Sequence, residues 1–315
     1  MKNGKLKYNL LLMLTALIWG GAFVAQSVGM DYIGPFTFNA VRSFLGSLVL
    51  LPVIWFMNRG KHTETGNGQQ ERRQERKTLL KAGICCGILL TISTSLQQIG
   101  LLYTSAGKAG FITALYILIV PVLGLFVGKK VGRKTWIGVV LAVVGMYLLC
   151  ITSGFSISFG DLLVLLCAVS FSFHILTVDY FSPKVDGVKL SCLQFFVCGV
   201  LSIGPMLMEQ PQISQILAAW MPIAYAGILS CGVAYTLQII TQKHLNPTVA
   251  SLLMSLESVF AVLTGWVVLH ERLSTREMLG CVLMFAAIIL AQLPQKETGK
   301  DTTEKDNTEK DREEG

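Results

Sequence analysis

The chain has 315 residues, of which 52% are hydrophobic and only 14% are charged. A soluble domain of this length carries roughly 25% charged residues, so the composition excludes an ordinary soluble protein. The net charge of +7 does not indicate nucleic-acid binding, because the basic residues lie in short segments between apolar runs, as in a membrane protein.

The apolar runs recur along nearly the whole chain, and each is long enough to cross a hydrocarbon core about 30 Å thick. We therefore predict an all-α polytopic membrane protein with ten transmembrane helices. In chain order they occupy residues 8–29, 35–57, 80–103, 106–127, 134–152, 160–180, 188–208, 215–240, 247–269 and 275–293. A polar loop at 58–81 and a tail at 294–315, expected to be disordered, lie outside these helices.

Lysine and arginine predict the orientation of the helices. With the N-terminus in the cytoplasm, the inner segments hold 22 of the 26 basic residues and the outer loops hold three, leaving Arg42 inside a span. Basic residues accumulate on the cytoplasmic side of membrane proteins. We therefore expect a multi-pass protein of the cytoplasmic membrane with both termini in the cytoplasm.

The two halves of the sequence resemble each other. "LLMLTALIWGGAFVAQ" at residues 11–26 matches "LVLLCAVSFSFHILTV" at 163–178 in character, and "VGKKVGRKTWIG" matches "LHERLSTREMLG" 142 residues later. Because each half holds five predicted helices, an odd number, the repeats at 8–152 and 160–293 would enter the membrane from opposite sides. Inverted repeats are typical of secondary transporters, whose substrate site lies near the midplane.

Several motifs carry a resemblance to a known family. They include "ALIWGGAFVAQ", "GPFTFNAVRSFLGSLVLLP" and "SLESVFAVLTGWVVLHERLS". At these residues the chain resembles the EamA-type transporters of the drug/metabolite transporter superfamily, over about residues 8–293. The resemblance implies amino acids, their relatives or nucleotide sugars as substrates, and export as the commoner direction. Two departures affect details of gating: Lys129-Lys130 stand where such proteins are often acidic, and Ser258 stands where proline is common.

Two charged residues lie deep in predicted spans. Glu257 is the one carboxylate in the apolar run 251–269, and a charge near the bilayer centre is costly. It could form a structural hydrogen bond, carry a proton or hold a cationic substrate group, so it is the candidate coupling residue. Arg42 either reaches the outer interface or lines a cavity, where it could pair with Glu257 or a substrate carboxylate. Glu271, beside Arg272, is interpreted as a loop charge.

Polar and aromatic residues of other spans complete the candidate cavity. Each could also serve only as an interhelical hydrogen bond, and a lone histidine is more often a satisfied core residue. The candidate substrate-binding residues are Trp19, Gln26, Asn39, Arg42, Gln97, Gln98, Tyr116, His174, Tyr235 and Gln238, with Gln194 a further intramembrane polar residue.

Motifs of enzymes and of metal or cofactor sites are missing from the sequence. It has no G-x-x-x-x-G-K-[ST], no H-E-x-x-H, no G-x-S-x-G and no Cys-x-x-Cys, so we expect no catalytic residues, no metal and no cofactor. The eight cysteines are interpreted as small hydrophobes. The spacing of Gly83 and Gly87 favours packing within the bundle, with a homodimer contact as the alternative.

These observations favour a secondary transporter of small polar metabolites, in particular amino acids or related compounds, that works by alternating access. Its partners would be a small-molecule substrate and membrane lipid. Two alternatives stay open. One is a non-transporting membrane module for assembly or sensing, which would depend on the 58–81 loop or the tail. The other is a flippase for a lipid-linked carrier with the same fold.

Overall fold

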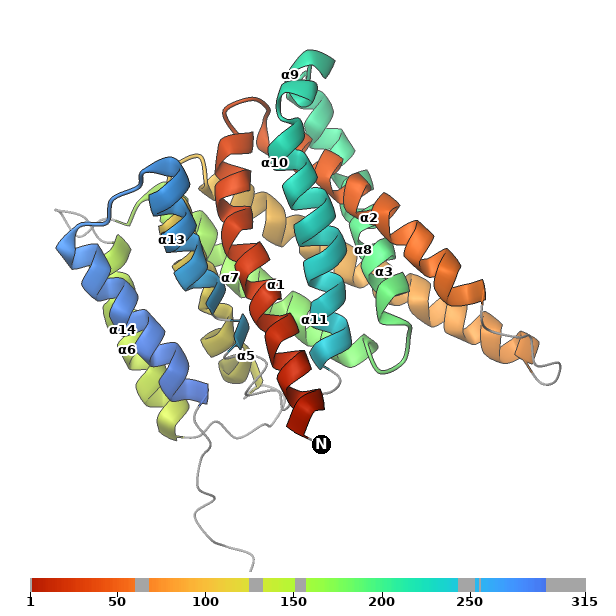
Figure 1. Cartoon of the computed structure of the whole chain (residues 1–315), viewed down its shortest axis with the longest axis horizontal. Coiled ribbons are helices and arrows are strands. Elements are labelled where there is room, and N and C mark those ends of the chain that lie inside the picture. Colours follow the sequence, from red (N-terminus) through yellow and green to blue (C-terminus); the bar gives the residue numbers. More distant parts are fainter. Residues whose placement is uncertain are drawn as a thin grey trace, which may run out of the picture.

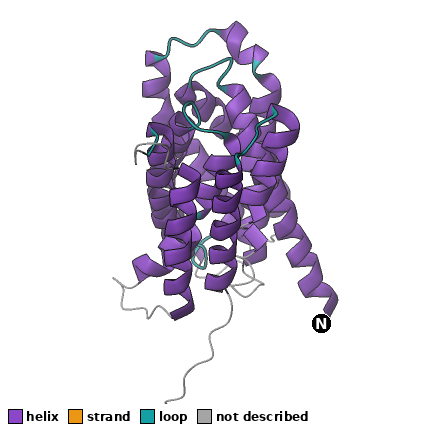
Figure 2. Cartoon of the chain, turned by 90° about the vertical axis from the view of Figure 1, so that its left-hand side faces the viewer, coloured by secondary structure: helices purple, strands orange, loops and turns teal. Residues whose placement is uncertain are grey.

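The computed structural model describes residues 2–59, 68–124, 133–150, 157–242, 253–254 and 256–292. Helices make up nearly all of this part of the chain and run between the two ends of a bundle (Figures 1 and 2). They are α1 (Lys2–Gly29), α2 (Pro35–Arg59), α3 (Gly68–Gly100), α4 (Ala106–Ala114), α5 (Tyr116–Gly124), α6 (Arg133–Cys150), α7 (Phe159–Phe181), α8 (Gly187–Met208), α9 (Ile213–Ala218), α10 (Trp220–Ala224), the π-helix η2 (Tyr225–Ala234), α11 (Tyr235–Gln242), α13 (Leu256–Leu269) and α14 (Thr275–Gln292).

The predicted all-α membrane fold is confirmed. Six helical segments are long and apolar enough to cross a bilayer: Leu6–Gly29, Pro35–Arg59, Arg73–Gly100, Phe159–Phe181, Gly187–Met208 and Trp220–Thr241. Three shorter apolar helices are Ala106–Val120, Trp136–Leu149 and Leu256–Leu269. The count of ten transmembrane helices stays a prediction, and the tail at 294–315 lies outside the described residues.

The third helix is longer than the sequence suggested. α3 begins at Gly68, within the segment 58–81 that was expected to be a loop. The residues after Gly68 are mainly Gln, Glu, Arg and Lys, which are good helix formers, and none of them is proline or glycine until residue 83. The expected loop is therefore helical from residue 68 onward, and residues 60–67 lie outside the described part.

Two predicted helices are interrupted along their length. The predicted helix 106–127 divides at Leu115, whose N–H bonds to the carbonyl of Ile112, three residues back, at 3.2 Å. The predicted helix 215–240 divides into α9, α10, η2 and α11, and η2 has the wider turns of a π-helix. Such departures from α-helical geometry are frequent at functional sites.

The packing brings helices of the two halves of the chain together. α6 packs against α14, and this pair lies at one side of the bundle (Figure 1). α2 packs against α8 and η2, α3 against α7 and α8, and α1 against α13 and η2. Gly83 and Gly87 face Leu193 and Val197 of α8, so these glycines serve contacts within the bundle. A homodimer stays a prediction.

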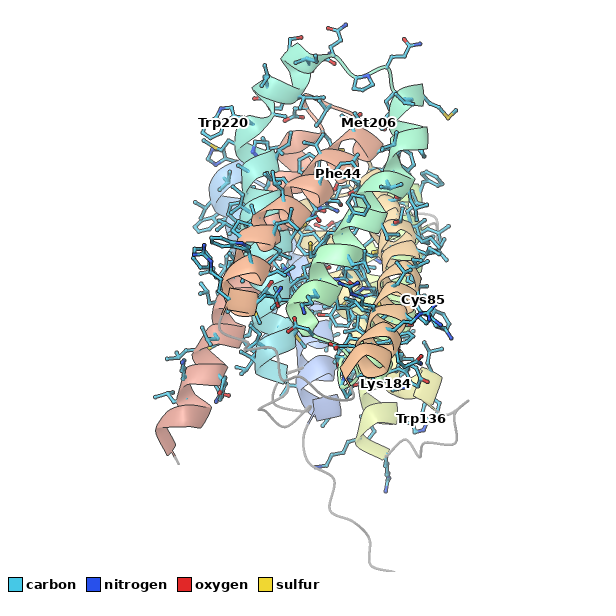
Figure 3. The ribbon with its side chains drawn as sticks, turned by 90° about the vertical axis from the view of Figure 1, so that its right-hand side faces the viewer. Phe44, Cys85, Trp136, Lys184, Met206 and Trp220 are labelled. Carbon is cyan, nitrogen blue, oxygen red and sulfur yellow. The ribbon has the colours of Figure 1, made fainter. Side chains whose placement is uncertain are left out.

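The bundle has two distinguishable ends. One, here called the α9 end, holds α9, Met206 and Trp220 (Figure 3). Lys184 and Trp136 lie toward the other, here called the N-terminal end. The start of α1 and the end of α14 both lie at the N-terminal end (Figure 1). The cytoplasmic location of both termini stays a prediction.

Candidate functional site

A cavity of about 340 Å³ lies among the helices. Its walls come from α1, α2, α3, α4, α5, α7, α8, η2, α11 and α13, so both halves of the chain contribute. The peripheral pair α6 and α14 contributes no described residue to it. Nine of the eleven residues selected from the sequence line this cavity, namely Trp19, Gln26, Arg42, Gln97, Tyr116, His174, Tyr235, Gln238 and Glu257.

Arg42 is buried in the cavity wall, with 5% of its surface exposed. Its Nη1 donates a hydrogen bond to Oε1 of Gln26 at 2.5 Å, and its guanidinium carbon lies 5.5 Å from the ring centroid of Phe38. The Gln26 amide donates in turn to the carbonyl of Ala22 at 3.0 Å. Among the described residues, no carboxylate forms an ion pair with Arg42. The guanidinium is thus held by an amide and a ring, and its charge is not neutralised.

Glu257 is equally buried, with 4% of its surface exposed, on α13. The hydroxyl of Tyr116 donates to its Oε1 at 2.9 Å. This contact joins α5 of the first half to α13 of the second. The hypothetical ion pair between Arg42 and Glu257 is not formed in this structure, although both residues line the same cavity. The cavity therefore holds a basic and an acidic side chain that are not paired with each other.

Amides and an imidazole form a second polar group in the wall. Nε2 of His174 lies 3.0 Å from Oε1 of Gln194, and both side chains are buried. The Nε2 atom of Gln194 is buried without a hydrogen-bond partner in the described structure. On α3, the Gln97 amide donates to Oγ1 of Thr113 at 3.2 Å. His174 thus has a hydrogen-bond partner on the neighbouring helix α8, and the Gln194 side chain has a free N–H donor in the described structure.

Aromatic rings form part of the wall between these polar groups. Trp19 and Tyr235 meet edge to face with ring centroids 4.9 Å apart, and Tyr235 meets Phe195 in the same manner at 5.1 Å. All three rings line the cavity. Edge-to-face rings pack favourably and present a rigid apolar surface. The wall can therefore take an apolar portion of a bound molecule while the charges hold its polar ends.

Two of the selected residues lie outside the cavity. Gln98 donates to the backbone carbonyl of Gln26 at 3.1 Å and so supports the residue that holds Arg42. Asn39 is fully buried, and neither polar atom of its side chain has a hydrogen-bond partner in the described structure. These residues are part of the helix packing around the site.

Smaller polar residues of the wall were not found from the sequence. They are Ser43, Thr94, Thr113, Asp179, Ser230 and Cys231. Thr94 shows why: its hydroxyl donates to the carbonyl of Leu90 in its own helix at 2.8 Å, which makes such a residue tolerable anywhere in a span. Asp179 lies near the end of its helix, where a charge is unremarkable. The signal for Thr94 and Thr113 is their spacing, since each lies three residues before a larger lining residue, Gln97 or Tyr116.

A comparison with known protein families and structures decides the class of this molecule. The model of the EamA-like transporter family matches residues 6–151 and again residues 158–293. The chain belongs to the EamA-like transporter family. These two matched ranges nearly coincide with the halves recognised in the sequence, and the inversion of one half relative to the other stays a prediction.

Relatives of this EamA family chain cover nearly its whole length. A protein of Archaeoglobus fulgidus named an uncharacterized transporter is 31% identical over 283 residues, which are 90% of this chain and 84% of the relative. The uncharacterized inner membrane transporter YedA of Escherichia coli K12 is 22% identical over 88% of each chain. A protein crystal structure that is 18% identical has the same fold, with a TM-score of 0.64 over 90% of this chain and 96% of the other. The protein is therefore a multi-pass membrane protein of a transporter family.

Proposed function

We propose that this protein is a secondary transporter that exports small zwitterionic metabolites, with amino acids the favoured class, by alternating access across the cytoplasmic membrane. The observation that carries the proposal is that Arg42 and Glu257 line one cavity, are both buried, and are not paired with each other. Because buried charges without a counter-charge are costly, a ligand that supplies both counter-charges would be favoured.

A zwitterion satisfies both sides of the cavity at once. Its carboxylate would accept hydrogen bonds from Arg42, whose planar guanidinium suits a carboxylate, and its ammonium would donate to Glu257. The cavity of about 340 Å³ is in the size range of small-molecule sites. The aromatic wall formed by Trp19 and Tyr235 would contact the apolar part of the substrate. In the absence of an ammonium, a proton could neutralise Glu257, which would couple transport to protons.

The contacts between the halves support alternating access. The predicted repeat makes α1 the counterpart of α7, α3 the counterpart of η2 with α11, and α4 with α5 the counterpart of α13. Under this correspondence, the contact between α3 and α7 is equivalent to the contact between η2 and α1. The contact between α1 and α13 is equivalent to the contacts that α7 makes with α4 and α5. Both members of each pair of contacts are present. Such exchangeable contacts would let the halves swap conformations and expose the same cavity to the other side.

The position of the cavity supports loading from the N-terminal end. Asp179 and Gln238 belong to the lining, and their helices end at Phe181 and Gln242 at that end of the bundle. The lysine and arginine distribution supports an orientation with the N-terminal end in the cytoplasm. A substrate would then enter from the cytoplasm, which is the direction required for export.

Comparative metabolite profiling of the culture medium tests the proposal. Cells would overproduce the wild type, Arg42→Gln or Glu257→Gln, with Arg59→Gln and Glu277→Gln as matched controls that remove the same charges outside the cavity. We expect one compound to accumulate with the wild type and both controls, and to fall to the empty-vector level with either cavity variant at equal membrane abundance. A wild-type profile identical to the empty vector would contradict export. A further variant that combines Arg42→Gln with Glu257→Gln should also fail to export, and transport by this double variant would contradict the role of the charges.

A further inference from the structure

We propose that Glu209 and Glu271 are positioning residues that latch the α9 end of the cavity, so that their release is the step that opens this end. The inference rests on the proposed alternating access and adds the groups that set its equilibrium. Both carboxylates come from the second half of the chain, and each binds the first turn of a helix in the first half. Neither residue lines the cavity that holds Arg42 and Glu257, although Glu209 lines a separate pocket of about 360 Å³.

Glu209 immediately follows α8 and binds the start of α2. Its Oε1 accepts from the backbone N–H of Phe36 at 2.9 Å. Its Oε2 accepts from the N–H of Thr37 at 2.8 Å and from the Thr37 hydroxyl at 2.6 Å. Any Cβ at Gly34 would collide with this carboxylate, so the glycine makes room for the contact. The start of α2 is thereby tied to the end of α8, 172 residues away along the chain.

Glu271 makes a similar connection between α13 and α4. Its Oε1 accepts from the N–H of Ala106 at 2.8 Å, and its Oε2 accepts from the N–H of Gly107 at 3.1 Å. The chain turns at His270, which has a φ of 56°, and the N–H of Glu271 returns to the carbonyl of Gly265 at 3.2 Å. This turn ends α13 and directs the carboxylate to α4. Glu271 is therefore not the simple loop charge expected from the sequence.

These contacts are strong because of where they are made. The first N–H groups of a helix have no partner within the helix and carry the positive end of its dipole, so a carboxylate there forms charge-assisted hydrogen bonds. α2 carries Arg42, and α4 carries Thr113 beside α5 with Tyr116, all of which line the cavity. Holding the starts of α2 and α4 against the second half therefore fixes cavity walls. Separation of the halves at this end must break all five hydrogen bonds.

The first half of the chain has no glutamate at the position that corresponds to Glu271 in the sequence repeat. The matched segments align Glu271 with Lys129, which lies outside the described residues. A lysine side chain only donates hydrogen bonds, so it cannot accept from the N–H groups of a helix start. The two ends of the transporter are thus chemically different, and the carboxylates favour the state with the α9 end closed.

Cysteine labelling from each face of the membrane tests the inference. Cys231 is buried in the cavity wall and serves as the reporter after the other seven cysteines are replaced by alanine. The full-length protein would be placed in sealed vesicles, and a membrane-impermeant maleimide would be added to one face at a time. The test variant combines Glu209→Ala with Glu271→Ala, and a second combines the two Glu→Gln substitutions, which keep one acceptor oxygen. The control is Glu277→Ala, which removes a carboxylate at the same end that pairs with Lys108 and accepts hydrogen bonds from Ser274 but does not bind the start of α2 or α4.

We expect the double alanine variant to label about ten times faster from the face that carries Glu209 and Glu271, and more slowly from the opposite face. The double glutamine variant should show a smaller shift in the same direction, and Glu277→Ala should stay near the parent. Unchanged rates in the double glutamine variant, or faster labelling from both faces, would overturn the latch. If the labelling rates of Cys231 change as expected but neither the wild type nor any variant exports a metabolite, the latch is supported and the proposed export is contradicted. If export is normal and the labelling rates are unchanged, the latch is contradicted and the proposed export is not.

Discussion

Replacement of Arg42 tests whether its guanidinium binds the substrate or only stabilises the fold. Arg42 has no ion-pair partner among the described residues, and its polar contact is to the neutral amide of Gln26. Arg42→Met keeps a long side chain of similar reach and removes the buried charge. Breaking a buried ion pair costs about 3–5 kcal/mol, whereas removing an unpaired buried charge relieves a desolvation penalty. The hydrogen bond to Gln26 is lost at a cost of about 1.5–3 kcal/mol, since one partner is charged. We therefore expect the free energy of unfolding to change by less than about 2 kcal/mol.

Transport should respond far more strongly than stability. If Arg42 binds the substrate carboxylate with two hydrogen bonds, Arg42→Lys keeps the charge and loses the paired geometry. The loss of one charge-assisted bond, about 1.5–3 kcal/mol, corresponds to a rise in KM of about 10- to 150-fold, because each 1.4 kcal/mol is tenfold. Arg42→Met should abolish transport at any practical substrate concentration.

The assay measures flux in proteoliposomes together with thermal unfolding in detergent. Arg59→Lys and Arg59→Met are the matched controls, because Arg59 is on the same helix, outside the cavity, and stacks on Trp55. Destabilisation by Arg42→Met of more than about 3 kcal/mol would refute the reasoning, since that is the cost of breaking a buried ion pair. An unchanged KM for Arg42→Lys would also refute it.

Three further predictions concern single positions. Gly83→Ala should destabilise by about 1–3 kcal/mol, because the added Cβ would overlap a side chain of α8, whereas Gly204→Ala, where the space is open, should be neutral or stabilising in thermal unfolding. Asn39→Leu should raise the unfolding temperature without changing flux, because it removes a buried amide that has no hydrogen-bond partner in the described structure; a lower temperature would contradict this. Tyr116→Phe should lower flux roughly tenfold at unchanged membrane abundance by removing the donor to Glu257, and full flux would exclude that contact from the mechanism.

The membrane fold and the charged residues of the candidate site could be predicted from the sequence alone. Length and apolarity of a run are local properties, and the bilayer has one thickness, so spans can be recognised without tertiary contacts. Arg42 and Glu257 stand out for the same reason, because a charge in a span is costly whatever its neighbours are. The interruptions at Leu115 and in η2 could not be recognised from length and apolarity, since both lie inside continuous apolar runs.

Which polar residues share the cavity depends on how the helices pack, and the sequence could not predict it. Gln97 and Gln98 are neighbours in sequence, yet successive helical residues point in directions about 100° apart, and only Gln97 lines the cavity. Asn39 and Arg42 are three residues apart, a spacing that makes them neighbours on one face of a helix, but the packing of α2 brings only Arg42 into the lining. The roles of Glu209 and Glu271 depend on backbone N–H groups more than 160 residues away. No local pattern predicts such a contact, because the donors are backbone N–H groups. These groups lack a hydrogen-bond partner only at the start of a helix, and the fold determines which acceptor lies near them.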